Sequence, residues 1–297
     1  MKHKRILLWS ITIIMLLTSI LTVIHIAKPV YAAQGSWKEE TCTSSEQHNK
    51  LYDVLALSPT NVRAVGTTSG KGLLVCTYDG SAWTASNPLS QYPNFEAQNI
   101  RAIGNELWVV GVNNNQSDHT AFIAHYTGSI WERIQTPDTG GEFASLYSLT
   151  ILSSTDIWAV GTKHGGNSSL IMRYDGNAWS IVEKPNALSQ VTGFTAICAN
   201  SGSDIWMSGF STGKSWLIHY DGNQWTPTES SWIGKLVCLS QNNVWGLEKN
   251  KSNQNLIHFD GNVWNPIPTA NTTLDSHTDL TVLSNTNVWT VGQNAGK

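Results

Sequence analysis

The chain of 297 residues is 40% hydrophobic and only 13% charged, with a formal net charge of −3. This length suits one sizeable domain or two small ones. The charged fraction lies well below the ~25% of an average soluble protein, which excludes a basic nucleic-acid binder, an acidic tail protein and a coiled coil. Fourteen tryptophans are an unusually large number for this length.

The start of the chain has the pattern of an export signal. A basic stretch at residues 2–5 precedes an uncharged apolar run over residues 6–27, and a small residue, Ala32, follows. This pattern favours a signal peptide cleaved after Ala32. The apolar run of 22 residues is also long enough to span a bilayer, so an uncleaved membrane anchor is the alternative. In both cases the basic start predicts that residues 33–297 lie outside the cytoplasm.

Removal of this leader changes the charge balance. Without residues 1–32 the chain keeps 14 basic and 21 acidic side chains, a net charge of −7. A net negative charge argues against DNA, RNA or an anionic membrane as a general partner. No second apolar run of spanning length follows in the sequence, so membrane contact is expected only through residues 6–27, and only if the leader is uncleaved.

A sequence motif of two parts recurs along the rest of the chain. Its clearest copy reads Asp-Ile-Trp-Ala-Val-Gly at residues 156–161 and Tyr-Asp-Gly-Asn-Ala-Trp at residues 174–179. The place of the first tryptophan recurs at intervals of 39 to 50 residues, at Arg63, Trp108, Trp158, Trp206, Trp245 and Trp289. The second recurs at Trp83, Trp131, Trp179, Trp225 and Trp264, with an extra copy at Trp37. We therefore expect these tryptophans to form a structural lattice and not a ligand-stacking set.

Each unit has the pattern of four short strands. The first strand precedes a turn, the second carries Trp-Ala-Val-Gly, the third ends at Tyr-Asp-Gly and the fourth carries the second tryptophan. β-Branched and aromatic residues favour strands, and Asp-Gly between two strands predicts a tight hairpin. No segment after residue 32 has a persuasive helical period.

Four-stranded units every ~45 residues without helices predict an all-β fold, a β-propeller. Residues 33–297 are expected to form one domain of about six four-stranded blades. The sixth unit ends at Lys297, after its second strand, so the last blade is expected to be incomplete. The strand around Trp37 is expected to join that blade and close the ring.

The repeat resembles that of the kelch and galactose-oxidase-like propellers over roughly residues 35–292. The shared features are an aromatic-rich second strand that ends in Gly, then Tyr-Asp, then Trp. Two features differ: a single Gly replaces the kelch double Gly, with Glu248 in its place in the fifth unit, and the connection from Tyr to Trp is shorter. The resemblance implies a divergent, exported kelch-like propeller.

Metal and cofactor chemistry are not predicted. Copper chemistry of the galactose-oxidase kind would need a tyrosine–cysteine pair with histidine ligands. Three histidines hold the same position in different units, at His125, His219 and His258. Equivalent positions in different blades lie far apart around a ring, so these side chains are expected to pack within their blades. We expect no metal site and no cofactor.

The four cysteines have no diagnostic spacing. Cys198 and Cys238 hold the same place in the first strands of neighbouring units, where packed thiols or a structural disulfide both fit. If a pair is oxidised, Cys42–Cys76 is favoured, because these strands belong to adjacent blades.

The long loops predict a binding face. The second-to-third and fourth-to-first connections of a propeller lie on one face, and in repeat proteins such variable loops carry the binding surface. Here they hold lysines and aromatic residues, at Lys71, Lys163, Lys214, Tyr92, Phe95, Phe143 and Trp232. These residues would suit an acidic polysaccharide or an acidic protein patch. Solvated loop lysines without a binding role are the simpler alternative.

The expected function is that of an exported, non-catalytic module that binds a protein or a surface glycan. The alternative is an extracellular carbohydrate-active enzyme, a glycosidase or lyase. A glycosidase needs two carboxylates that face one pocket, and no acidic pair stands out in the sequence.

Overall fold

The computed structural model describes residue 42 and residues 49–69, 72–114, 121–140, 143–163, 168–249, 254–267 and 276–293. The predicted leader, the strand around Trp37 and Lys71 lie outside these residues. Within the described ranges, no helix is long and apolar enough to cross a membrane.

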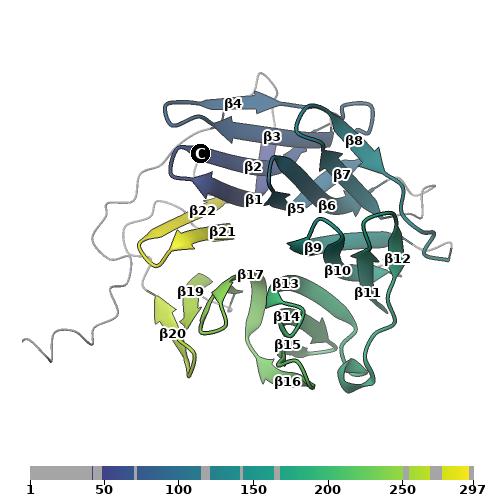
Figure 1. The fold of residues 1–297 in the computed structure, drawn as a ribbon, viewed down its shortest axis with the longest axis vertical. Helices are drawn as coiled ribbons and strands as arrows, with labels where there is room; N and C mark the ends of the chain where they lie inside the picture. Colours follow the sequence, from purple (N-terminus) through teal and green to yellow (C-terminus); the bar gives the residue numbers. More distant parts are fainter. Residues whose placement is uncertain are drawn as a thin grey trace, which may run out of the picture.

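Six antiparallel blades follow one another in chain order around a ring (Figure 1), and the second and third of them join into one eight-stranded sheet through the pair Val112–Ser145. Blade one contains β1 (Asn49–Ser58), β2 (Asn61–Thr68), β3 (Gly72–Tyr78) and β4 (Trp83–Ser86). Blade two contains β5 (Phe95–Ile103), β6 (Glu106–Asn113), β7 (Phe122–Tyr126) and β8 (Trp131–Ile134). Blade three contains β9 (Ala144–Ser153), β10 (Asp156–Lys163), β11 (Ser168–Tyr174) and β12 (Trp179–Ile181).

The second half of the ring has the same plan. A short 3₁₀ helix, η3 (Asn186–Leu188), leads into blade four, which contains β13 (Gly193–Ser201), β14 (Asp204–Ser211), β15 (Lys214–Tyr220) and β16 (Trp225–Ser230). Blade five contains β17 (Trp232–Ser240), β18 (Asn243–Lys249), β19 (Gln254–Phe259) and β20 (Trp264–Ile267). In the described residues blade six contains two strands, β21 (Ser276–Ser284) and β22 (Asn287–Gln293).

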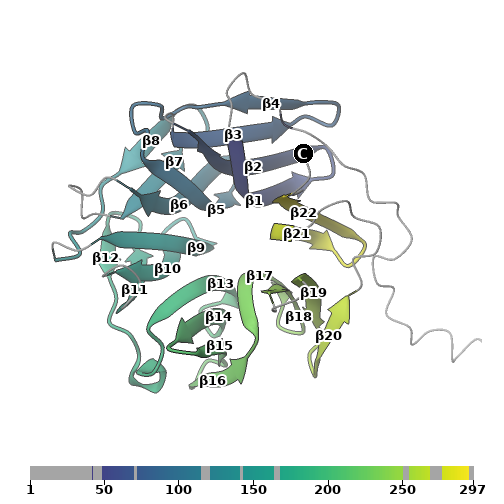
Figure 2. The ribbon, with the colours of Figure 1, turned by 180° about the vertical axis from the view of Figure 1, so that it is seen from behind.

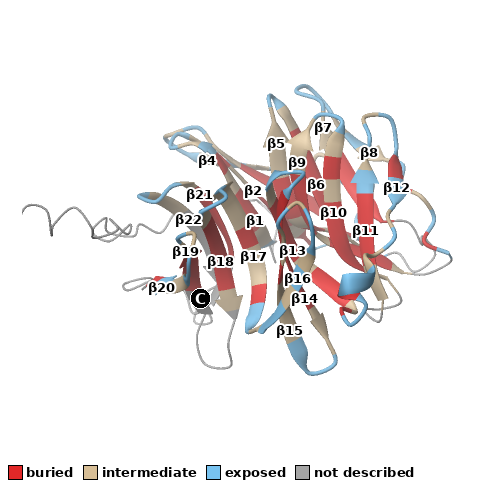
Figure 3. Ribbon diagram, turned by 60° about the horizontal axis from the view of Figure 1, so that its bottom comes forward, coloured by how far each residue is buried: buried red, intermediate tan, exposed pale blue. Residues whose placement is uncertain are grey.

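The first strand of every blade is the innermost one. Each inner strand contacts the inner strands of the two neighbouring blades, and β21 contacts β1, so the ring is closed (Figures 1 and 2). Buried residues run along the strands of the sheets (Figure 3). The all-β propeller prediction is therefore confirmed. The predicted closure by the strand around Trp37 falls outside the described residues.

Local sequence explains the outer hairpins. In blade three, Asp175 Oδ1 accepts hydrogen bonds from the backbone N–H groups of Asn177 and Ala178 at 2.9 and 3.0 Å. Gly176, which follows Asp175 in the turn, has a φ of 96°, which an L side chain rarely adopts. The Asp-Gly hairpin prediction is confirmed here, and the same contacts recur at Asp79, Asp221 and Asp260.

The glycine near the end of the second strand is required for a different reason. A Cβ atom on Gly161 would lie 1.9 Å from the backbone oxygen of Ser145 on the inner strand. The two strands approach too closely there for any side chain, which explains why the repeat carries glycine at this place.

The repeated tryptophans join neighbouring blades. The Trp108 ring stacks on His125 of its own blade, with centroids 4.0 Å apart, and lies 5.2 and 6.0 Å from Tyr174 and Trp179 of blade three. In blade four, Trp206 makes the corresponding contacts with His219, Phe259 and Trp264. The interpretation of these tryptophans as a structural lattice agrees with this packing.

The three histidines at the shared position lie in separate blades. His125 Nε2 lies 2.9 Å from Glu106 Oε2, His219 Nε2 lies 2.8 Å from Asp204 Oδ1, and His258 Nε2 lies 2.8 Å from Asn243 Oδ1. Each histidine therefore lies between two residues of its own blade. One is the tryptophan on which its ring packs, and the other is the polar residue two positions before that tryptophan.

Side chains next to a β-bulge of each inner strand link the blades at the axis. Asp279 Oδ2 of blade six accepts a hydrogen bond from Val54 N of blade one at 2.7 Å. Asp53 Oδ2 accepts one from Ile100 N of blade two, and Asn99 Oδ1 accepts one from Leu149 N of blade three at 2.8 Å. Ser148 Oγ accepts the next, from Ile197 N of blade four, at 3.2 Å. We call this series the axial belt.

The axial belt changes between blades four and five. The corresponding residue of blade four is Ala196, which has no acceptor side chain. The hydroxyls of Thr195 and Ser208 instead donate to the Ile233 carbonyl oxygen at 2.9 and 2.8 Å. A disulfide between Cys198 of β13 and Cys238 of β17 joins the same two blades.

Both cysteine pairs are bonded. The favoured pair, Cys42–Cys76, forms a disulfide and is confirmed. The second bond, Cys198–Cys238, resolves the choice between thiols and a disulfide that the sequence left open.

Candidate ligand-binding pocket

The β2–β3 and β4–β5 connections meet on one face of the ring, as the propeller pattern predicts. A Cβ atom on Gly72, the first residue of β3, would lie 2.2 Å from the Tyr92 backbone oxygen. Tyr92 is fixed in turn by backbone hydrogen bonds, from its own N–H to Leu89 O and from Phe95 N to its carbonyl. The connection is therefore a packed loop that ends at the first strand of blade two.

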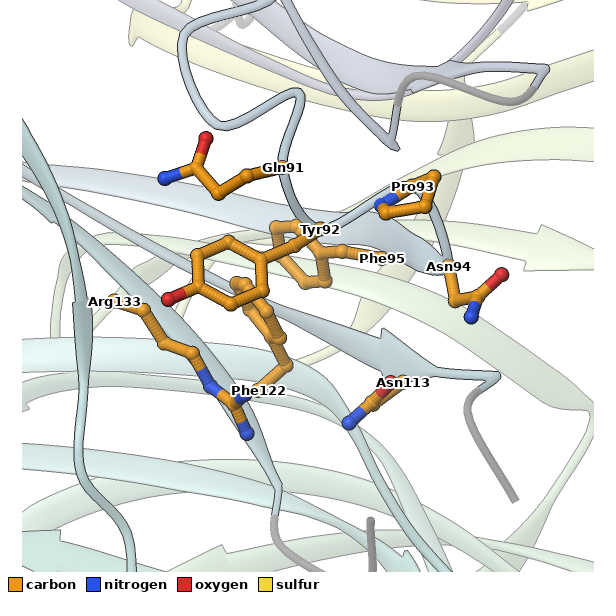
Figure 4. A pocket seen from close by; sticks show the side chains of 8 residues that line it. All are labelled: Gln91, Tyr92, Pro93, Asn94, Phe95, Asn113, Phe122 and Arg133. Atoms are coloured by element: carbon orange, nitrogen blue, oxygen red, sulfur yellow. The ribbon is translucent and has the colours of Figure 1, made fainter. Parts of the chain in front are cut away.

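A cavity of about 80 Å³ opens where this connection meets the loop end of blade two (Figure 4). Four of its lining residues come from the connection and four from blade two: Gln91, Tyr92, Pro93, Asn94, Phe95, Asn113, Phe122 and Arg133. We call this cavity the Tyr92 pocket.

Aromatic rings form the inner wall of the Tyr92 pocket. Phe95 and Phe122 are each 1% exposed and stack with their ring centroids 3.8 Å apart. The Tyr92 ring meets Phe122 edge to face at 5.4 Å. The Arg133 guanidinium lies 4.8 Å from the Phe122 centroid and 5.3 Å from the Tyr92 centroid, at cation–π distance from both rings.

The polar lining is rich in hydrogen-bond donors. Three amide side chains line the pocket together with the arginine, those of Gln91, Asn94 and Asn113 (Figure 4). Gln91 and Asn94 are exposed, and their amide groups make no side-chain hydrogen bond in the described part of the chain. None of the eight lining residues is Asp or Glu. The pocket therefore suits a ligand that offers hydrogen-bond acceptors.

The structure places two of the seven predicted binding residues, Tyr92 and Phe95, in this pocket. Lys163 ends β10 and Phe143 precedes β9 in blade three, so both lie at the same end of the strands as the pocket, one blade further on. Lys71 lies outside the described residues.

The other two predicted residues lie across the ring on the same face. Lys214 at the start of β15 is paired with Glu229, with Nζ 2.6 Å from Oε2. Trp232 at the start of β17 is 38% exposed and stacks on Phe210 at 5.3 Å. The six predicted binding residues that the structure describes therefore share a face but do not form one site.

Sequence reasoning did not identify Asn113, Phe122 and Arg133 as lining residues. Arg133 lies on the outermost strand of blade two, opposite Ala124 of β7. Its position in the sequence could have indicated this. Arg133 lies two residues after Trp131, and side chains two residues apart on a strand lie on the same face of the sheet.

A second polar cluster lies at the axis. Asp53 and Asp279 are fully buried, and Lys235 Nζ lies 3.8 and 3.4 Å from their Oδ1 atoms. Arg101 Nη1 lies 3.2 Å from Asp53 Oδ2. Burial and the neighbouring Asp53 carboxylate raise the pKa of Asp279. Protein groups thus surround this carboxylate pair, and neither carboxylate lines the Tyr92 pocket.

No protein-family model matches the chain, and no curated protein matches it. Among solved structures, the chain is similar to YCF48 bound to D1 peptide, with 14% identity over 88% of this chain and 94% of that chain and a TM-score of 0.52. It is also similar to the SapL1 lectin in complex with alpha methyl fucoside, with 15% identity, 75% and 82% coverage and a TM-score of 0.57. The fungal lectin of Aleuria aurantia, described as a six-bladed β-propeller, is 14% identical over 75% of this chain and 80% of that chain, with a TM-score of 0.55.

These likenesses show the fold of the chain, a six-bladed β-propeller. They do not confirm the finer resemblance to kelch repeats, which stays a prediction.

Proposed function

We propose that the chain is an exported, non-catalytic propeller that binds a protein or a glycan on the face that carries the Tyr92 pocket. The observation that carries this proposal is the pocket itself. It combines a buried aromatic wall, a fixed guanidinium and two exposed amides. Such concave sites with few, convergent polar groups are typical of ligand binding.

The proposal favours binding over hydrolysis because of where the carboxylates lie. A glycosidase needs two carboxylates that face its substrate, ~5–9.5 Å apart. The Tyr92 pocket has no carboxylate among its lining residues. The buried pair, Asp53 and Asp279, accepts backbone and side-chain hydrogen bonds and faces Lys235. The carbohydrate-active enzyme is therefore the weaker candidate.

Export is supported by two independent features. The leader has the composition of a signal peptide or anchor, and all four cysteines are paired in disulfides. Structural disulfides persist in oxidising compartments and are rare in the cytosol. Sequencing the N-terminus of the exported protein tests the cleaved form, because Ala33 would then be the first residue. Retention in the membrane with residues 1–32 intact would support the anchor.

The similar structures are consistent with a binding role. One is titled as bound to D1 peptide and two others as lectins. Propellers with this fold therefore bind both peptide and glycan ligands. This supports a binding function for the chain, and the identity of its ligand must be determined by experiment.

The test compares two variants of the full-length chain on a glycan array and against proteins of the native cell surface. Tyr92→Ser removes the ring that packs on Phe122 and Arg133. We expect it to weaken the binding seen with the wild type by about fivefold or more, the effect of losing a contact worth ~1 kcal/mol.

The matched control is Ile130→Ser. Ile130 is 61% exposed on a β7–β8 turn, at the opposite end of the strands. This variant should bind as the wild type does. Equal binding by wild type and Tyr92→Ser would show that the partner docks elsewhere.

A further inference from the structure

We propose that the Tyr92 pocket binds the carboxylate of an acidic sugar residue, such as a hexuronic acid within a glycan. This inference rests on the proposed binding function and specifies its ligand class. It is argued from the size of the cavity, the charge of its lining and the hydrogen-bonding groups at its rim.

The size of the cavity limits what can enter. A water molecule occupies ~30 Å³ of the liquid, so a cavity of about 80 Å³ holds two or three waters. A carboxylate with one adjacent hydroxyl is of that size, whereas a whole pyranose ring is larger. The ligand is therefore expected to insert one edge and to leave the rest of its ring against the rim.

The charge of the lining selects an anion. Arg133 is the one charged residue among the eight that line the cavity. Of the acids described near it, Glu96 accepts a hydrogen bond from Asn114 at 2.9 Å, and Glu132 lies 3.4 Å from His125 Nδ1. A guanidinium has five N–H donors in a planar fork that matches a carboxylate, so it serves a ligand and a protein partner together.

The aromatic contacts hold this arginine in place. Its guanidinium lies over Phe122 and Tyr92, and Phe122 is itself fixed by stacking on Phe95. A cation held by two rings needs little reordering when the ligand arrives, which lowers the entropic cost of binding.

The rim favours a sugar over an acidic peptide. The side chains of Gln91 and Asn94 and the Tyr92 hydroxyl contribute polar groups to the lining (Figure 4). Amides and hydroxyls both donate and accept, as sugar hydroxyls do. Peptide interfaces depend on apolar anchors that enter desolvated pockets, whereas Phe95 and Phe122 already fill the apolar part of this one.

The test uses the full-length chain and three polymeric probes in isothermal titration. The probes are polygalacturonate, the same polymer with its carboxylates methyl-esterified, and poly-glutamate. We expect polygalacturonate to bind, and esterification to weaken binding by about tenfold or more, as expected for loss of a charge-assisted hydrogen bond. Equal binding of the esterified polymer, or equal or tighter binding of poly-glutamate, would overturn the proposal.

Variants assign the site. Arg133→Gln should weaken polygalacturonate binding about tenfold or more, and Asn94→Ala should weaken it by a smaller factor. Asn94 is exposed, so its substitution keeps the test valid if Arg133→Gln does not fold. Lys214→Gln is the matched control, since it removes a cation from the same face without touching the pocket. A larger loss from Lys214→Gln than from Arg133→Gln would contradict the assignment.

The outcomes separate this inference from the proposed function. If Tyr92→Ser weakens binding of some other partner while polygalacturonate does not bind, the binding face stands and the acidic sugar is wrong. If Tyr92→Ser leaves every binding activity unchanged, the proposed function fails as well.

Discussion

Lys235 Nζ of blade five lies 3.4 Å from Asp279 Oδ1 of blade six, at the centre of the ring. The same ammonium group donates a hydrogen bond to the Gln98 carbonyl oxygen of blade two at 2.8 Å and lies 3.8 Å from Asp53 Oδ1 of blade one. One side chain therefore bridges four blades, and it does so where the last blade meets the first.

Replacing Lys235 with Met is expected to destabilise the protein strongly. The change leaves two buried carboxylates with less positive charge to face, and breaking a buried ion pair costs about 3–5 kcal/mol. Chemical denaturation of wild type and variant measures this difference. Lys214→Met is the control, because its ion pair with Glu229 is about half exposed and such pairs contribute about 0–1 kcal/mol. Equal losses would mean that the axial contacts do not stabilise the ring.

The tryptophan lattice gives a second prediction. Trp179 is 5% exposed and contacts both Tyr174 and Trp108, so Trp179→Ala should lower the free energy of unfolding by about 3–5 kcal/mol. Trp232, which is 38% exposed, should lose far less on the same change. The denaturant midpoints of the two variants test this prediction. Similar midpoints would show that the repeated tryptophans do not stabilise the fold more than an exposed tryptophan does.

The third prediction concerns acid. Backbone N–H groups of the outer hairpins lower the pKa values of four aspartates, Asp79, Asp175, Asp221 and Asp260. At Asp79 the hydrogen bonds from Ala82 and Ser81 lower the pKa to about 2. Because the unfolded value is about 3.9, this stabilisation is present above pH ~4 and is lost as the pH falls through the folded values.

Changing all four aspartates to Asn keeps an acceptor in each turn and removes the titration. We expect the melting temperature of this variant to fall less between pH 5 and about 2.5 than that of the wild type. The pKa of Asp279 shifts the other way, but Asp279 is present in both proteins and its effect cancels in the comparison. Parallel melting curves over this range would contradict the prediction.

The blades could be predicted from the sequence because their signals are local. The Asp-Gly turn at Asp175 and the close approach at Gly161 each depend on residues within one blade, and they repeat. The Cys198–Cys238 disulfide could also have been predicted from the repeat. Equivalent positions on adjacent inner strands lie side by side, which is a stronger signal than spacing alone.

The axial cluster and the pocket could not be predicted in the same way. Val54 and Asp279 are 225 positions apart, and Lys235 and Gln98 are 137 apart, so no periodicity of the chain relates them. The Tyr92 pocket joins a connection to the outermost strand of the following blade. Its guanidinium, Arg133, has no repeated counterpart that would identify it.

The covalent bond between Cys198 and Cys238 lies at the junction where Ala196 interrupts the axial belt. The two ends of the folded ring, β21 and β1, instead meet through carboxylates and an ammonium group. At the junction of blades four and five, two hydroxyl hydrogen bonds to the Ile233 carbonyl oxygen and one disulfide replace the acceptor side chain of the axial belt. Reduction would remove this covalent link and leave the two hydrogen bonds and the apolar packing between blades four and five, so the redox state of the surroundings is expected to affect the strength of this one junction.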